Sequence, residues 1–134
     1  MRDSIVERQR ILLVDDDPSI RNLYSKALSQ AGFLVKTAEN GKTAFDTVEQ
    51  FQPHLIILDL VMPEQEGIGT LLQVQSKDPN VPVLAISGAM GANEYLSVAN
   101  ILGASRTLEK PIKAERLVET VKALLAEAKA QGAG

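Results

Sequence analysis

Acidic residues follow two short apolar segments of this 134-residue chain, at positions where a carboxylate is unexpected. Three consecutive aspartates, Asp15 to Asp17, directly follow ILLV, and Asp59 directly follows HLIIL. Two carboxylates roughly 4 Å apart repel each other by about 4 kcal/mol at an effective dielectric constant of about 20. A cation should therefore accompany them, and oxygen ligands in a chain without cysteine favour a hard divalent ion such as Mg²⁺.

A hydroxyl and an amine extend this set. Ser87 directly follows VPVLAI, and Lys110 comes two residues after SRTL. An aspartate can accept a phosphoryl group when a metal ion and a lysine neutralise the charge of the transferring group. The combination of residue types therefore suggests phosphoryl chemistry, provided that the fold brings them together.

The elements that must position these residues alternate along the chain. Segments of strand character occupy residues 10–14, 33–37, 54–58, 81–86 and 105–108. Apolar residues at helical spacing run from Ile20 to Ala31, between Pro18 and Gly32, and occupy residues 42–51, 67–76, 92–101 and 113–129. This alternation predicts a doubly wound α/β fold, with a parallel sheet covered by helices on both faces. Ligands bind at the carboxyl ends of such strands, where all the residues named above are expected to meet.

Composition excludes several classes of function. The net charge of −3 gives no basic surface for nucleic acid. No apolar run approaches the roughly 20 residues that span a bilayer, so we expect a cytoplasmic protein. Residues 1–9 form an expected charged leader, residues 10–130 one domain, and residues 131–134 a flexible tail.

Four short motifs together resemble the receiver domain of two-component response regulators. These are VDDD at 14–17, LDLVMPEQEG at 58–67, AISG at 85–88 and LEKP at 108–111. The resemblance covers roughly residues 10–130 and implies a flavodoxin-like, CheY-like fold whose five strands lie in the order 2-1-3-4-5. It also implies Mg²⁺ as the cofactor.

The resemblance assigns a role to each site residue. Asp16 would bind Mg²⁺ directly, Asp15 would assist through water, and the backbone carbonyl of Val61 would supply another ligand. Asp59 would be both a metal ligand and the phosphoacceptor. Two further side chains would contact the phosphoryl oxygens, namely Ser87 and Lys110.

The implied function is that of a phosphorylation switch. A histidine kinase or histidine phosphotransfer protein would phosphorylate Asp59, and the chain would promote only this transfer and its own slow dephosphorylation. It would not be a turnover enzyme. An effector protein would bind the face made by the fourth helix, fifth strand and fifth helix, and a phosphorylation-dependent homodimer is a further expected partner. Thr107 stands where many receivers carry an aromatic switch residue, which leaves the coupling to this face open.

Other interpretations compete with this one. Asp17 precedes Pro18 and is expected to cap a helix, and His54 is expected to be structural or exposed. The pattern Asp15-x-Asp17-x-Ser19 resembles the nucleophile motif of haloacid dehalogenase-like phosphohydrolases, although the order of the later motifs favours a receiver. A receiver-shaped interaction module that no longer takes up phosphate is the third interpretation.

Overall fold

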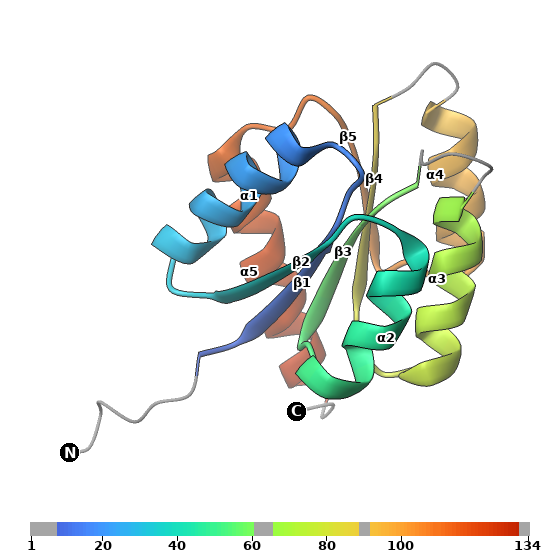
Figure 1. Cartoon of the computed structure of the whole chain (residues 1–134), viewed down its shortest axis with the longest axis horizontal. Helices are drawn as coiled ribbons and strands as arrows, with labels where there is room; N and C mark the ends of the chain where they lie inside the picture. The colour runs from blue at the N-terminus through green and yellow to red at the C-terminus, as the bar shows by residue number, and fades with distance from the viewer. Residues whose placement is uncertain (1–7, 61–65, 89–91, 132–134) are drawn as a thin grey trace.

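A computed structural model describes residues 8–60, 66–88 and 92–131 of the chain (Figure 1). The strands are β1 (Arg10–Val14), β2 (Leu34–Ala38), β3 (Leu55–Asp59), β4 (Val83–Ser87) and β5 (Arg106–Glu109). The helices are α1 (Pro18–Gln30), α2 (Gly41–Phe51), α3 (Glu66–Lys77), α4 (Ala92–Ile101) and α5 (Ala114–Ala130). The predicted alternation is confirmed. The leader and tail expected at residues 1–9 and 131–134 lie mostly outside the described residues.

The strands form one five-stranded parallel sheet in the order β2-β1-β3-β4-β5. The predicted fold class and strand order are therefore confirmed. Because β1 lies between β2 and β3, the winding reverses beside β1, and the loops after β1 and β3 diverge at that point. This is the edge of the sheet at which the sequence places its acidic residues.

Alternate residues of each central strand enter two separate cores. Ile11 and Leu13 of β1 pack with residues of α1 and α5, whereas Leu12 and Val14 pack with residues of α2, α3 and α4. Figure 1 shows these two groups of helices on opposite sides of the sheet. Every residue of β3 and of β4 is buried, which explains why their sequences are continuous apolar runs rather than alternating ones.

Helix α1 begins and ends at the residues that the sequence indicates. The Asp17 side chain accepts a hydrogen bond from the Ser19 backbone N–H at 2.9 Å, and Pro18 occupies the first turn. Gly32 follows the helix with a φ of 100°, a conformation that favours glycine. The apolar stripe is narrower than expected, because Leu23 is 54% exposed whereas Tyr24, the next residue, is buried.

The opposite edge of the sheet is held by contacts of β1 with its neighbours. The Arg10 guanidinium donates to the carbonyls of Phe51 and Gln52, both at 2.9 Å, where α2 ends with Gln52 in the left-handed region. His54 Nδ1 accepts a hydrogen bond of 2.8 Å from the Arg10 backbone N–H. The structural role expected for His54 is confirmed.

Within the described part of the chain, none of the helices combines the length and the apolar character that crossing a membrane requires.

Candidate functional site

The predicted site residues lie where strands end. Asp59 and Ser87 are the last residues of β3 and β4, while Asp15 directly follows β1 and Lys110 directly follows β5. The Lys110 backbone N–H donates to the Ser87 carbonyl at 2.8 Å, so that the ends of β4 and β5 remain aligned. The structure thus brings together residues that are far apart in the sequence, as their positions predict.

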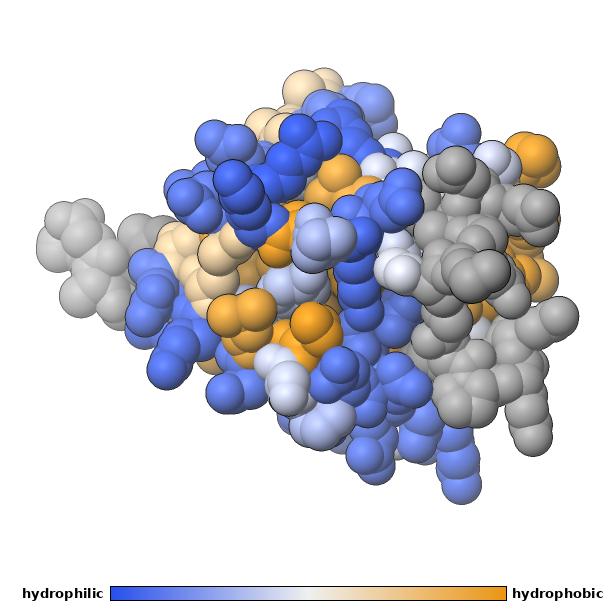
Figure 2. All heavy atoms as spheres, turned by 90° about the horizontal axis from the view of Figure 1, so that it is seen from above, coloured by the Kyte–Doolittle hydropathy of each residue, from blue (hydrophilic) through white to orange (hydrophobic). Residues whose placement is uncertain are grey.

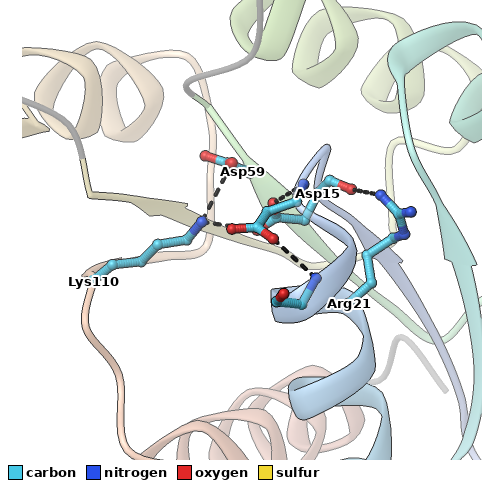
Figure 3. A network of polar contacts seen from close by, with 6 residues as sticks. Asp15, Arg21, Asp59 and Lys110 are labelled. Atoms are coloured by element: carbon cyan, nitrogen blue, oxygen red, sulfur yellow. Dashed lines mark hydrogen bonds and ion pairs between the residues drawn. The ribbon is translucent and has the colours of Figure 1, made fainter.

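Lys110 links two of the carboxylates. Its Nζ donates to Oδ2 of Asp15 at 2.8 Å and to Oδ2 of Asp59 at 3.4 Å, as Figure 3 shows. Burial alone would lower the pKa of Lys110, but the hydrogen bond to Asp15 and the charge of Asp59 outweigh it and raise this pKa above its usual value. The lysine is therefore held charged. The Lys110–Pro111 peptide bond is cis.

Three carboxylates gather close enough to hold one cation. One oxygen from each of Asp15, Asp16 and Asp59 lies within 4.8 Å of the others. Asp15 and Asp59 are buried, and Asp16 is exposed. Both oxygens of Asp15 have partners, since Oδ1 accepts from the Asp17 N–H at 2.9 Å and Oδ2 accepts from Lys110. This set of oxygen donors suits Mg²⁺, which binds one or two carboxylates and keeps several waters.

Ser87 brings an unsatisfied hydroxyl to the same edge. Its side chain is fully buried, and its Oγ has no hydrogen-bond partner among the described residues. A buried polar atom without a partner costs about 1–3 kcal/mol. The neighbouring Gly88 allows Lys110 to approach, because a Cβ at Gly88 would lie 2.7 Å from the Lys110 Cβ. A ligand oxygen that entered this edge of the sheet could accept a hydrogen bond from the Ser87 hydroxyl, which is buried without a partner among the described residues.

Sequence reasoning missed Arg21. Its Nη1 donates to the backbone carbonyl of Asp15 at 2.7 Å, and Figure 3 shows its side chain approaching Asp15 from the side opposite Lys110. The available signal was a long side chain one turn into α1, close enough to reach back to the end of β1.

A groove leads from the surface of α1 to the site. Its volume is about 480 Å³, and it is lined by Leu23, Tyr24 and Ile112 and opens onto Asp59 and Lys110. Burial raises the pKa of the Tyr24 phenol, opposed in part by the Lys110 charge and a backbone hydrogen bond from Ile112. Viewed from above, this edge carries apolar patches among hydrophilic residues (Figure 2).

A larger cavity of about 750 Å³ lies at the other edge of the sheet, where β4 and β5 begin. It is lined by residues such as Gln75, Ser105 and Glu127, and none of the clustered carboxylates borders it. The smaller groove is therefore the one relevant to the chemistry.

The sequence singles out two further positions, Val61 and Thr107. Val61 lies outside the described residues, so its carbonyl as a metal ligand stays a prediction. Thr107 lies in β5, pairs with Ala85 of β4 and is partly buried.

Comparison with known proteins relates this chain to one family. The family model described as the response regulator receiver domain matches residues 11–122. Response regulator MprA of Mycolicibacterium vanbaalenii is 32% identical over 116 residues, which are 87% of this chain and 50% of MprA. MprA of Mycobacterium bovis is 32% identical over 124 residues, covering 92% of this chain and 54% of that protein. The chain thus spans about half the length of these relatives.

Solved structures are similar over nearly the whole chain. NtrX from Brucella abortus is 31% identical with a TM-score of 0.87, covering 93% of this chain and 28% of NtrX. The receiver domain of a putative LuxO repressor from Vibrio parahaemolyticus is 32% identical with a TM-score of 0.84, covering 94% of this chain and 96% of that domain.

Proposed function

Because this chain belongs to the response regulator receiver domain family and is a receiver of two-component signal transduction, we propose that Asp59 is its phosphoacceptor. The supporting observation is the position of Lys110, whose ammonium contacts both Asp59 and Asp15 at the rim of a three-carboxylate cluster. Asp59 is nearly buried, yet it borders the groove through which a phosphodonor can reach it.

We assign the direct Mg²⁺ contact to Asp16 and a water-mediated contact to Asp15. Asp16 is exposed, whereas the oxygens of Asp15 already accept bonds from Asp17 and Lys110. The Val61 carbonyl would complete the protein ligands together with Asp59. When bound, Mg²⁺ would neutralise the charge that the carboxylates and the phosphoryl oxygens bring together.

The proposed transfer uses phosphohistidine as donor. A carboxylate oxygen of Asp59 attacks the phosphorus atom, the P–N bond breaks, and the leaving imidazole takes a proton from solvent. Lys110 then binds one phosphoryl oxygen with its charge, and the Ser87 hydroxyl donates to another. Water then attacks the phosphorus atom of the acyl phosphate, the bond to the carboxylate oxygen breaks, and inorganic phosphate leaves while Asp59 returns to its carboxylate form. The chain is therefore a stoichiometric switch that acts on itself, rather than a turnover enzyme.

We propose two kinds of protein partner in the cytoplasm. A histidine kinase or histidine phosphotransfer protein would approach along the groove beside Leu23, and its imidazole would reach Asp59. An effector, or a second phosphorylated copy, would bind the face of α4, β5 and α5. Two apolar residues of α4 are exposed, with Val98 at 43% and Ile101 at 83%. Thr107 lies beneath this face without the aromatic ring that many receivers use.

Intact-mass measurement after incubation with acetyl phosphate and Mg²⁺ tests the assignment. We expect the wild-type protein and Asp17→Asn to gain one phosphoryl group, and Asp59→Asn to gain none. A label that persists in Asp59→Asn but disappears in Asp15→Asn would instead support the hydrolase interpretation. Absence of labelling by both acetyl phosphate and a kinase would support the interaction module.

A further inference from the structure

We propose that Arg21 is a positioning residue for the acidic turn between β1 and α1, and that it sets the affinity of this turn for Mg²⁺. The inference rests on the Mg²⁺ site of the proposed function. It adds a residue on a helix that contributes no ligand to that site. The observation that carries it is the hydrogen bond of 2.7 Å from Arg21 Nη1 to the backbone carbonyl of Asp15.

The position of that carbonyl gives the contact its effect. The oxygen belongs to the peptide unit that joins Asp15 to Asp16, and this unit is planar because its C–N bond has partial double-bond character. A bond that holds the carbonyl oxygen therefore fixes the plane that carries the Cα atoms of both acidic residues. One guanidinium can in this way orient two carboxylates without touching either of them.

The two carboxylates depend on this contact to different degrees. Asp15 is also held by its own N–H, which donates to the Ala38 carbonyl at 3.1 Å, and by the bond to Lys110. Asp16 is exposed, and its N and Cα atoms lie in the peptide plane that Arg21 holds. The effect of losing Arg21 should therefore fall mainly on Asp16, the residue assigned to direct metal contact.

Arg21 is itself held in place by the helix that carries it. Its backbone N–H donates to the Asp17 carbonyl at 3.0 Å in the first turn of α1, and its side chain is partly buried. Figure 3 shows the guanidinium and the Lys110 ammonium on opposite sides of Asp15. The orientation of α1 relative to the sheet is thereby transmitted to the acidic turn.

The charge of Arg21 acts against its positional effect. A guanidinium near the site repels a divalent cation, so a neutral substitution would change affinity in two opposite directions. Arg21→Lys keeps the charge and loses the planar fork that reaches the carbonyl, and so isolates the positional contribution. Lys26, exposed on the same helix, provides a matched control for altering a cation of α1.

Calorimetric titration with Mg²⁺ is the decisive experiment. We expect Arg21→Lys to bind Mg²⁺ about tenfold more weakly than the wild-type protein, as typical for residues that orient metal ligands. The rate of labelling by acetyl phosphate should return to within about threefold of wild type once Mg²⁺ is saturating, since the acceptor itself is intact. Lys26→Met should retain the wild-type Mg²⁺ affinity.

A merely structural role of Arg21 gives a different result. Arg21→Lys would then lower the urea midpoint but bind Mg²⁺ as the wild-type protein does, and this outcome overturns the inference. An equal loss of affinity in Lys26→Met would overturn it as well. If Arg21→Lys fails to fold, Arg21→Gln is titrated at high ionic strength, where repulsion between residue 21 and the cation is screened in both proteins, and wild-type affinity under that condition counts against the inference. Failure of the metal site itself is recognised separately, because the wild-type protein and Asp16→Asn would then give the same Mg²⁺ titration.

Discussion

The ammonium of Lys110 lies 2.8 Å from a carboxylate oxygen of Asp15, a residue 95 positions earlier in the chain. Since β3 and β4 separate β1 from β5 in the sheet, this side chain spans the ends of the two most buried strands. It supplies a positive charge that contacts the buried carboxylates of both Asp15 and Asp59. We therefore expect loss of this contact to affect both the stability of the fold and the proposed reaction of Asp59.

We predict that Lys110→Met lowers the free energy of unfolding by about 2–3 kcal/mol in chelator-treated buffer, because it removes the cation that contacts two buried carboxylates. Saturating Mg²⁺ should restore much of this loss, since the ion neutralises the same groups. Urea unfolding with and without Mg²⁺ measures both quantities. Lys113→Met, which alters an exposed lysine nearby, is the control. A Lys110→Met protein as stable as wild type without Mg²⁺ would contradict the prediction.

We predict that Ser87→Ala leaves the metal-free protein as stable as wild type or about 1 kcal/mol more stable, because the hydroxyl that it removes is buried and makes no hydrogen bond to the described residues. Labelling of Asp59 by acetyl phosphate should slow by about tenfold or more. Thr70→Val is the matched control, since the Thr70 hydroxyl is also buried without a partner among the described residues but lies in α3. It should gain stability without changing the labelling rate.

We predict that Asp17 stabilises the fold whereas the adjacent Asp16 binds Mg²⁺. Asp17→Ala should lower the free energy of unfolding by about 1 kcal/mol, because it removes the cap of α1, and should leave Mg²⁺ affinity within about twofold. Asp16→Ala should abolish measurable Mg²⁺ binding with little change in stability. Urea unfolding and calorimetry on both variants give the comparison. Equal losses of Mg²⁺ affinity would show that the two residues have been wrongly distinguished.

We predict that Gly67→Ala is destabilising by about 2 kcal/mol despite alanine's higher helix propensity. A Cβ at Gly67 would overlap the backbone carbonyl of Leu60, the residue after Asp59, so labelling of Asp59 should also slow. Gly69→Ala on the same helix has no atom within 4 Å of the added Cβ. It should stabilise the protein by about 0.5–1 kcal/mol. Thermal unfolding of the two variants side by side decides the matter.

We predict a Tyr24-dependent loss of stability at high pH. Burial raises the pKa of the Tyr24 phenol above its unfolded value of 10.0. The neutral phenol therefore contributes fully to the free energy of unfolding below pH 10.0, and this contribution is lost as the pH rises through the folded-state pKa. Tyr24→Phe removes the ionisable hydroxyl and keeps the buried ring. Its stability should then fall less steeply than that of wild type above pH 10. The free energy of unfolding is measured by urea titration at each pH. An equally steep fall above pH 10 in wild type and Tyr24→Phe would refute this assignment.

The sheet and the position of its reactive edge could be predicted from the sequence because both depend on local patterns. Three apolar runs identify the central strands, two shorter and more polar segments identify the edge strands, and the order of the motifs places Asp59, Ser87 and Lys110 after three of the five. Element bounds shifted by only one or two residues, as when β4 begins at Val83 rather than at residue 81. The cap at Asp17 was equally local, since a following proline marks the start of a helix.

The missed features depend on how elements pack. A long side chain one turn into α1 places Arg21 within reach of the end of β1, but the orientation of α1 relative to the sheet decides that it contacts the Asp15 carbonyl. The exposure of Leu23 has the same origin, because α1 turns Tyr24 toward the core instead. The close approach of Gly67 to Leu60 likewise requires knowledge of where α3 lies. The packing of the helices on the sheet, rather than the type of residue, determines these contacts and exposures.

The complete burial of β3 has a last consequence for how its position is specified. A strand that is apolar on both sides could slide by one residue past its neighbours without exposing any apolar side chain to water. Asp59 removes that freedom, because a shift would carry its charge into one of the cores or away from Lys110. The residue proposed for signalling therefore also encodes the alignment of the strand that bears it.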